Sequence, residues 1–141
     1  MQVFVPYPAP LDVARCLDPK RLNKQIIECQ QILDAIDRKS DAWKNHPVTK
    51  MYYPYRSWLQ HYLNVLVNFK EGDLGHAEWW NKHANYMRPA FLTEDFCDQH
   101  KRRLYTKAPS LYPQFEEYGT TEENWYFLDG EVVKYIKGKR V

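Results

Sequence analysis

Apolar residues return at helical spacing along most of the chain, and the clearest case follows Asp18. Steps of four and three place these residues on one stripe of a helix: Leu22, Ile26, Cys29, Leu33 and Ile36. Asp18 followed by Pro19 is typical of a helix start, because the carboxylate accepts free backbone N–H groups and proline presets the φ angle of the first turn. The pattern predicts a helix from Pro19 to about Arg38 whose stripe faces the core.

Four further helices are predicted around this one. A short helix over 11–17 precedes it, and residues 48–73 are helical, interrupted or restarted at Pro54 and ended at Gly72. Trp58, Tyr62 and Val65 keep helical spacing in that segment. The segments LGHAEWWNKHANYM (74–87) and TEDFCDQHKRRLYTK (93–107) predict two more helices, separated by RPAF.

The two ends of the chain have a different pattern. VFVPYPAP (3–10) is stopped by three prolines, which favours a short extended arm over a strand in a sheet. Near the C-terminus, strand-forming residues flank Asp129-Gly130, a strong hairpin signal. We therefore predict a mainly α fold: one compact helical domain over 1–141 with an extended N-terminal arm and a short C-terminal β-hairpin.

Composition narrows the class of protein. A length of 141 residues suits one domain, and a 27% charged fraction excludes a membrane protein. Net charge is only +2, so any basic surface must come from local clustering. Three widely spaced cysteines, without a CxxC pair, argue against a disulfide framework or a zinc knuckle. The start MQVFVPYPAP lacks the features of a signal peptide, and we expect a cytoplasmic protein.

The flank of the predicted 19–38 helix carries the first candidate chemistry. At about 100° per residue, Arg21, Gln25 and Glu28 fall together beside the apolar stripe, with Lys24 slightly further out. Cations can hold a phosphate backbone, and an acid among them then suits general acid or base work. Solvated helix ion pairs at three- and four-residue spacing explain the same residues, and composition alone favours that reading.

Two other segments are candidates for binding phosphate. In WKNHP, Lys44 and Asn45 could grip phosphate and His46 could shuttle a proton, although an ordinary turn before a helix-entry proline is equally consistent. The run HKRRLYTK (100–107) is the densest basic segment and predicts either a phosphate-contact stripe or a solvated face. His76 and His83, seven apart, do not have zinc-ligand spacing, and no Walker or GxGxxG motif appears.

RLNKQIIE, followed by WKNHP and a Trp/Tyr-rich C-terminal end, resembles the pyrimidine-dimer DNA glycosylase family, the small phage-type endonuclease V enzymes and their bacterial relatives. The resemblance implies a compact, mostly helical enzyme whose N-terminal α-amine attacks the sugar of a damaged pyrimidine nucleotide. It implies no metal and no cofactor.

By this resemblance Glu28 takes the place of the family's essential acid, and Arg21 that of the basic residue on backbone phosphate. The catalytic set is then Glu28, Met1, Arg21 and Lys24. Further DNA contacts are expected from Arg15, Lys20, Gln25, Lys44, Asn45, His46, Lys101, Arg102 and Arg103.

The sequence departs from the phage enzymes at its start. There the residue after Met is small, so Met is removed; here Gln2 is bulky and should leave Met1 in place. The nucleophile is then the amine of Met1, or a nearby lysine such as Lys24, or absent. The arm is also longer and rich in proline, so its tip need not reach Glu28.

The predicted function is removal of a damaged or modified pyrimidine from double-stranded DNA by a monomeric glycosylase, with or without AP-lyase activity. Two rivals stay open: a non-catalytic DNA-binding module of the same fold, and a helical protein-interaction domain. Only the interaction domain predicts no salt-dependent affinity for DNA.

Overall fold

The computed structural model describes residues 1–83 and 88–141, and its first two helices are those predicted from the sequence. α1 spans Pro10–Cys16 and α2 spans Pro19–Ile36. Asp18 caps α2, since its carboxylate accepts a hydrogen bond of 3.1 Å from the backbone N–H of Arg21. The helix ends two residues before Arg38, which has a positive φ of 61°.

The predicted interruption at Pro54 is confirmed. α3 (Pro47–Tyr52) passes through a 3₁₀ turn, η1 (Tyr53–Tyr55), into α4 (Arg56–Lys70). α5 spans Leu74–Lys82 and α6 spans Glu94–Lys107. The last four residues of the predicted 74–87 helix lie outside the described residues.

A small antiparallel sheet follows the last helical segment, η2 (Pro113–Tyr118). β1 (Glu123–Leu128) pairs with β2 (Glu131–Ile136) across Asp129-Gly130, whose φ angles of 53° and 81° are those of a type I′ turn. The hairpin is confirmed, and a short third strand, β3 (Lys139–Arg140), extends it. The prediction of a mainly α fold is likewise confirmed.

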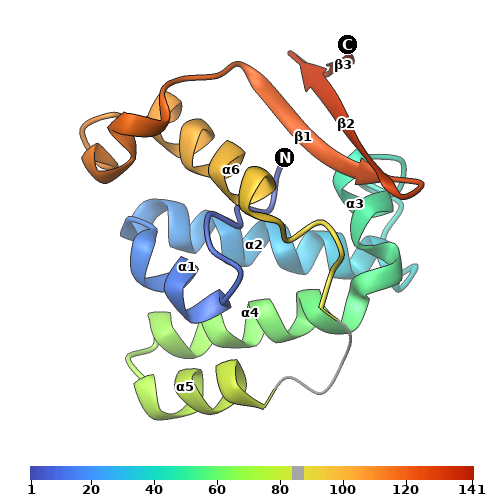
Figure 1. Cartoon of the computed structure of the whole chain (residues 1–141). Helices are drawn as coiled ribbons and strands as arrows, with labels where there is room; N and C mark the ends of the chain where they lie inside the picture. Colours follow the sequence, from blue (N-terminus) through green and yellow to red (C-terminus); the bar gives the residue numbers. More distant parts are fainter. Residues whose placement is uncertain (84–87) are drawn as a thin grey trace.

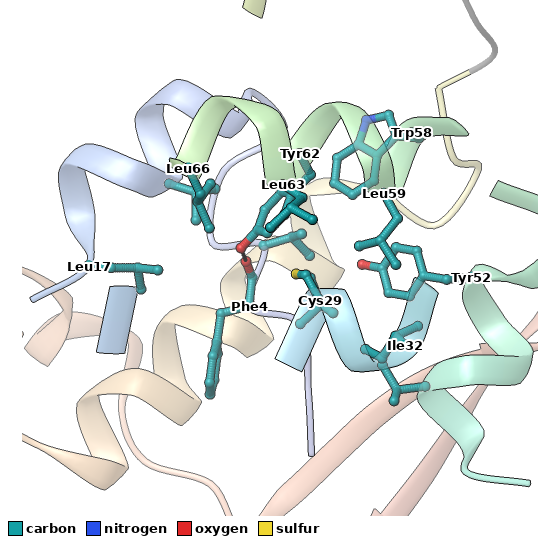
Figure 2. Packing of buried hydrophobic residues seen from close by; sticks show 14 of the residues in the cluster. Phe4, Leu17, Cys29, Ile32, Tyr52, Trp58, Leu59, Tyr62, Leu63 and Leu66 are labelled. Atoms are coloured by element: carbon teal, nitrogen blue, oxygen red, sulfur yellow. Dashed lines mark hydrogen bonds between the residues drawn. The ribbon is translucent and has the colours of Figure 1, made fainter. Parts of the chain in front are cut away.

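The main hydrophobic core is built between α2, α4 and the N-terminal arm (Figures 1 and 2). On α2, three residues of the predicted stripe are buried, while Ile26 and Ile36 are only half-buried. Gln25 and Ile32 are buried instead, at 1% and 0% exposure. Because the arm packs beside α2 as well as α4, the buried arc of the helix is wider than the apolar stripe and includes a polar residue.

The arm is extended and lies outside the sheet, as predicted, but Gln2 to Pro6 are all buried. In Figure 1 the arm runs between α2 and α6, and its N-terminal end lies beneath β1. None of the helices in the described ranges, 1–83 and 88–141, has the length and apolar character to cross a membrane.

Candidate active site

Side chains of the helices form hydrogen bonds with the backbone of the N-terminal arm, where a strand would have backbone–backbone hydrogen bonds. Gln25 of α2 uses both ends of its amide: Oε1 accepts from the N–H of Phe4 at 2.7 Å, and Nε2 donates to the carbonyl of Gln2 at 3.0 Å. Backbone groups buried without partners are costly, and these two bonds satisfy two of them. The predicted DNA contact of Gln25 therefore falls on a residue whose polar atoms are both engaged inside the protein.

Two more side chains fix the arm from other helices. The hydroxyl of Tyr62 on α4 donates to the carbonyl of Phe4 at 2.7 Å, the bond drawn in Figure 2. On α6, Nδ1 of His100 accepts from the N–H of Val5 at 2.8 Å. The path of the arm is thus set by three helices that are far apart in sequence.

This path brings the start of the chain to Glu28. The backbone N–H of Gln2 donates to Oε2 of Glu28 at 3.4 Å, and Lys24 Nζ lies 3.8 Å from Oε1. The hydroxyl of Tyr126 on β1 donates to the carbonyl of Met1 at 3.2 Å. The longer, proline-rich arm therefore does reach the acid.

A small polar pocket of about 90 Å³ forms where the arm, α2, α6 and β1 meet. Its lining holds one acid and four cationic side chains and consists of Met1, Gln2, Phe4, Arg21, Lys24, Glu28, Arg103, Lys107 and Asn124. The structure thus brings all four residues of the predicted catalytic set to one pocket, together with Arg103. Their roles in a reaction remain predictions.

The electrostatics of the pocket favour a neutral amine at Met1. Burial lowers the pKa of its α-amine below the ordinary 8.0; Glu28 raises it, and the charges of Lys107 and Lys24 lower it further. An α-amine has a lower ordinary pKa than a lysine side chain, and lowering that pKa further increases the fraction of neutral, nucleophilic amine. Burial and the neighbouring cations therefore shift this amine toward the form that can act as a nucleophile.

Lys107 is a pocket residue that the sequence reasoning did not select. It ends the basic run four residues after Arg103, so the two share a face of α6. Partial burial lowers its pKa, and the neighbouring charges of Arg103, Arg21 and Lys24 act in the same direction. The four-residue spacing was the signal that could have distinguished it within the run.

The other basic residues of this run point away from the pocket. Lys101 pairs with Asp98 at 3.0 Å, and its ammonium lies over the rings of Tyr7 and Tyr118. Arg102 donates through Nε to the carbonyl of Tyr118 at 2.8 Å. Lys101 thus joins both η2 and the arm to α6, and Arg102 joins η2 to it.

The remaining predicted contacts on the first two helices divide between two faces. Lys20 lines a second pocket of about 310 Å³ that shares Arg21, Lys24 and Lys107 with the first one. Arg15 lies 3.8 Å from Glu78 of α5, at a different part of the surface. Lys20 therefore extends the basic surface of the pocket, whereas Arg15 is separate from it.

The WKNHP turn does not line the pocket, but its His46 lies near the Met1 amine and against Tyr126. Nδ1 of His46 caps α3 by accepting from the N–H of Val48 at 3.1 Å, and its ring packs against Tyr126. Burial, with the nearby Met1 amine, lowers the pKa of His46 to about 4, so the ring is neutral at pH 7. Lys44 and Asn45 are exposed, and Lys44 lies 3.6 Å from Asp41.

Residues 1–68 match the model of a protein family described as pyrimidine dimer DNA glycosylase. The resemblance inferred from RLNKQIIE and WKNHP is confirmed over this part of the chain, which includes the arm, α2 and most of α4. No curated protein and no solved structure gives a significant match. The wall of the pocket contributed by α6 and β1 lies beyond the matched residues.

Proposed function

We propose that this protein is a DNA glycosylase that removes a damaged or modified pyrimidine from double-stranded DNA, with the α-amine of Met1 as nucleophile. The observation that carries the proposal is the position of Met1, which lines one pocket with Glu28 and four cations and whose α-amine interacts electrostatically with Glu28. The similarity of residues 1–68 to a family of DNA glycosylases supports the substrate class.

The first step joins protein and sugar. The neutral amine attacks C1′, and the base leaves with the electron pair of its glycosidic bond and is protonated by solvent. Glu28 accepts a proton from the attached amine and returns it to O4′ as the sugar ring opens, which leaves a protonated imine between Met1 and C1′. One carboxylate is sufficient, because the proton it takes is the proton it gives back.

The same residues support a lyase step. Glu28, again ionised, removes a proton from C2′; the electrons move toward the imine and expel the 3′-phosphate by β-elimination. Arg21, Lys24, Arg103 and Lys107 bind the phosphates on either side of the sugar, since cations with several donors hold phosphate oxygens in register. Water then hydrolyses the imine and frees the amine.

Borohydride trapping tests this proposal, because the reagent reduces an imine to a stable amine and leaves a covalent protein–DNA adduct. Protein with an intact N-terminus is incubated with duplexes carrying an abasic site, a cyclobutane dimer or no lesion, and the adduct is mapped by mass spectrometry. We expect an adduct on Met1 with lesion-containing DNA only, lost when the α-amine is acetylated.

Matched variants separate Met1 from the lysines of the pocket. The adduct should persist on Met1 in Lys24→Gln and Lys107→Gln proteins. An adduct on either lysine would refute the role of the α-amine. Salt-sensitive DNA binding with neither an adduct nor base release would point to a binding module.

A further inference from the structure

The side chain of Gln2 has no part in the reaction proposed above, yet it is buried beside the reacting amine. It is only 7% exposed, and its amide faces Nε2 of His100 at 3.4 Å. His100 is itself 1% exposed and belongs to α6. Burying two polar side chains costs free energy unless they bond each other, so this contact next to Met1 needs an explanation.

The protonation of His100 follows from its other contact. Nδ1 accepts from the N–H of Val5, so the neutral ring carries its proton on Nε2. Burial and the charge of Arg103 lower the pKa of His100 to about 3, which keeps the ring neutral at pH 7.

The amide of Gln2 is best oriented with its oxygen toward this N–H. The opposite orientation sets two donors against each other and leaves Oε1 buried without a partner in the described part of the chain. Rotating the amide by half a turn places Oε1 as the acceptor of a hydrogen bond from His100 Nε2–H.

Gln2 is then held at three points by three side chains. Its N–H donates to Glu28, its carbonyl accepts from Gln25, and its side chain accepts from His100. Met1 directly precedes Gln2, so only the few bonds of Met1 itself leave the α-amine free to move. We also expect the bulk of the Gln2 side chain to keep Met1 on the chain.

We propose that Gln2 and His100 are positioning residues, which anchor the start of the chain so that the α-amine of Met1 is directed at the sugar beside Glu28. This inference rests on the proposed function. Holding a nucleophile in place lowers the entropic part of the barrier, and a displacement of about 1 Å can cost on the order of 100-fold in rate.

Gln2→Leu tests the anchor, because leucine has a similar size, cannot accept the hydrogen bond and still leaves Met1 in place. Gln99→Leu is the matched control: Gln99 is also a buried glutamine, 2% exposed and one residue from His100, but it bonds Thr121 and Glu123. Intact mass verifies Met1 in each protein.

We expect single-turnover trapping on abasic DNA to slow by about 10- to 100-fold in the Gln2→Leu protein, with DNA affinity close to that of the wild type. A released amine is better solvated, so its pKa rises and the pH dependence of trapping moves to higher pH. A purely structural role would change stability in both variants and leave the pH dependence in place. Gln2→Met gives a second, more flexible substitution that also retains Met1, should the leucine variant fail to fold.

The failures of the two proposals are distinguishable. If wild-type protein forms no adduct on Met1, the proposed function fails. If wild-type protein does form the adduct, and Gln2→Leu matches Gln99→Leu in rate and pH dependence, only the anchor is refuted.

Discussion

The helices α2 and α6 both line the pocket and differ in how their charges are used. On α2, Arg21, Lys24 and Glu28 all line it. On α6, three basic residues are consecutive, but of these only Arg103 lines the pocket. A dense basic run is therefore a poorer guide to a site than charges spaced three and four apart.

Helix geometry explains the difference. Neighbouring residues diverge by about 100° around a helix, so a consecutive run must send its side chains to different surroundings. Lys101 and Arg102 turn toward η2, where they stabilise the fold. Lys107, four residues beyond Arg103, returns to the pocket. We therefore expect Lys101 and Arg102 to be structural cations of α6, and Arg103 and Lys107 to be its DNA-binding cations.

The largest expected effect comes from removing the acid of α2. In a Glu28→Gln protein, single-turnover base release and trapping should fall by about 10²- to 10⁴-fold, the usual contribution of a general acid–base group. DNA affinity should not fall, because the lost charge repels phosphate. Asp98→Asn, which removes the acid that pairs with Lys101 on α6, should leave the rate near that of the wild type. Equal rates for Glu28→Gln and wild type would exclude the acid's role.

A smaller effect separates the cations of α6. Lys107→Gln should weaken binding to lesion DNA several-fold and reduce the slope of log K against log salt by about 1, since one phosphate contact is lost. Lys101→Gln should leave that slope unchanged, because this ammonium is already paired with Asp98. Fluorescence anisotropy over a range of salt measures both. Identical slopes for the two variants would mean that helical position does not select the DNA contacts.

The smallest expected effect is a shift in pH dependence. The charge of Lys107 lowers the pKa of the Met1 α-amine, so its removal in Lys107→Gln raises that pKa toward 8.0. The trapping rate rises with pH as the amine loses its proton, and the midpoint of this rise should move to higher pH. Lys101→Gln should show no such shift. A midpoint that moves to lower pH would contradict the assignment of the titrating group.

The amino-acid sequence by itself determined most of the secondary structure. Asp18-Pro19, Pro54 and Asp129-Gly130 act locally, through capping, a missing N–H and a turn conformation, and each element that they predict is present. RLNKQIIE likewise identified the family resemblance and the flank that carries Glu28. These features depend on neighbouring residues along the chain, which a sequence displays directly.

Only the tertiary structure decided where the N-terminal arm packs and which residues of α6 contact the arm or line the pocket with it. The burial of Gln25, the anchoring of Gln2 by His100 and the return of Lys107 to the pocket depend on contacts between segments distant in sequence. No local pattern distinguishes a glutamine that binds a ligand from one that satisfies buried backbone groups, because the choice depends on what packs against it. The arm packs beside α2, and the α2 flank that carries Arg21, Lys24 and Glu28 therefore lines a pocket together with the arm.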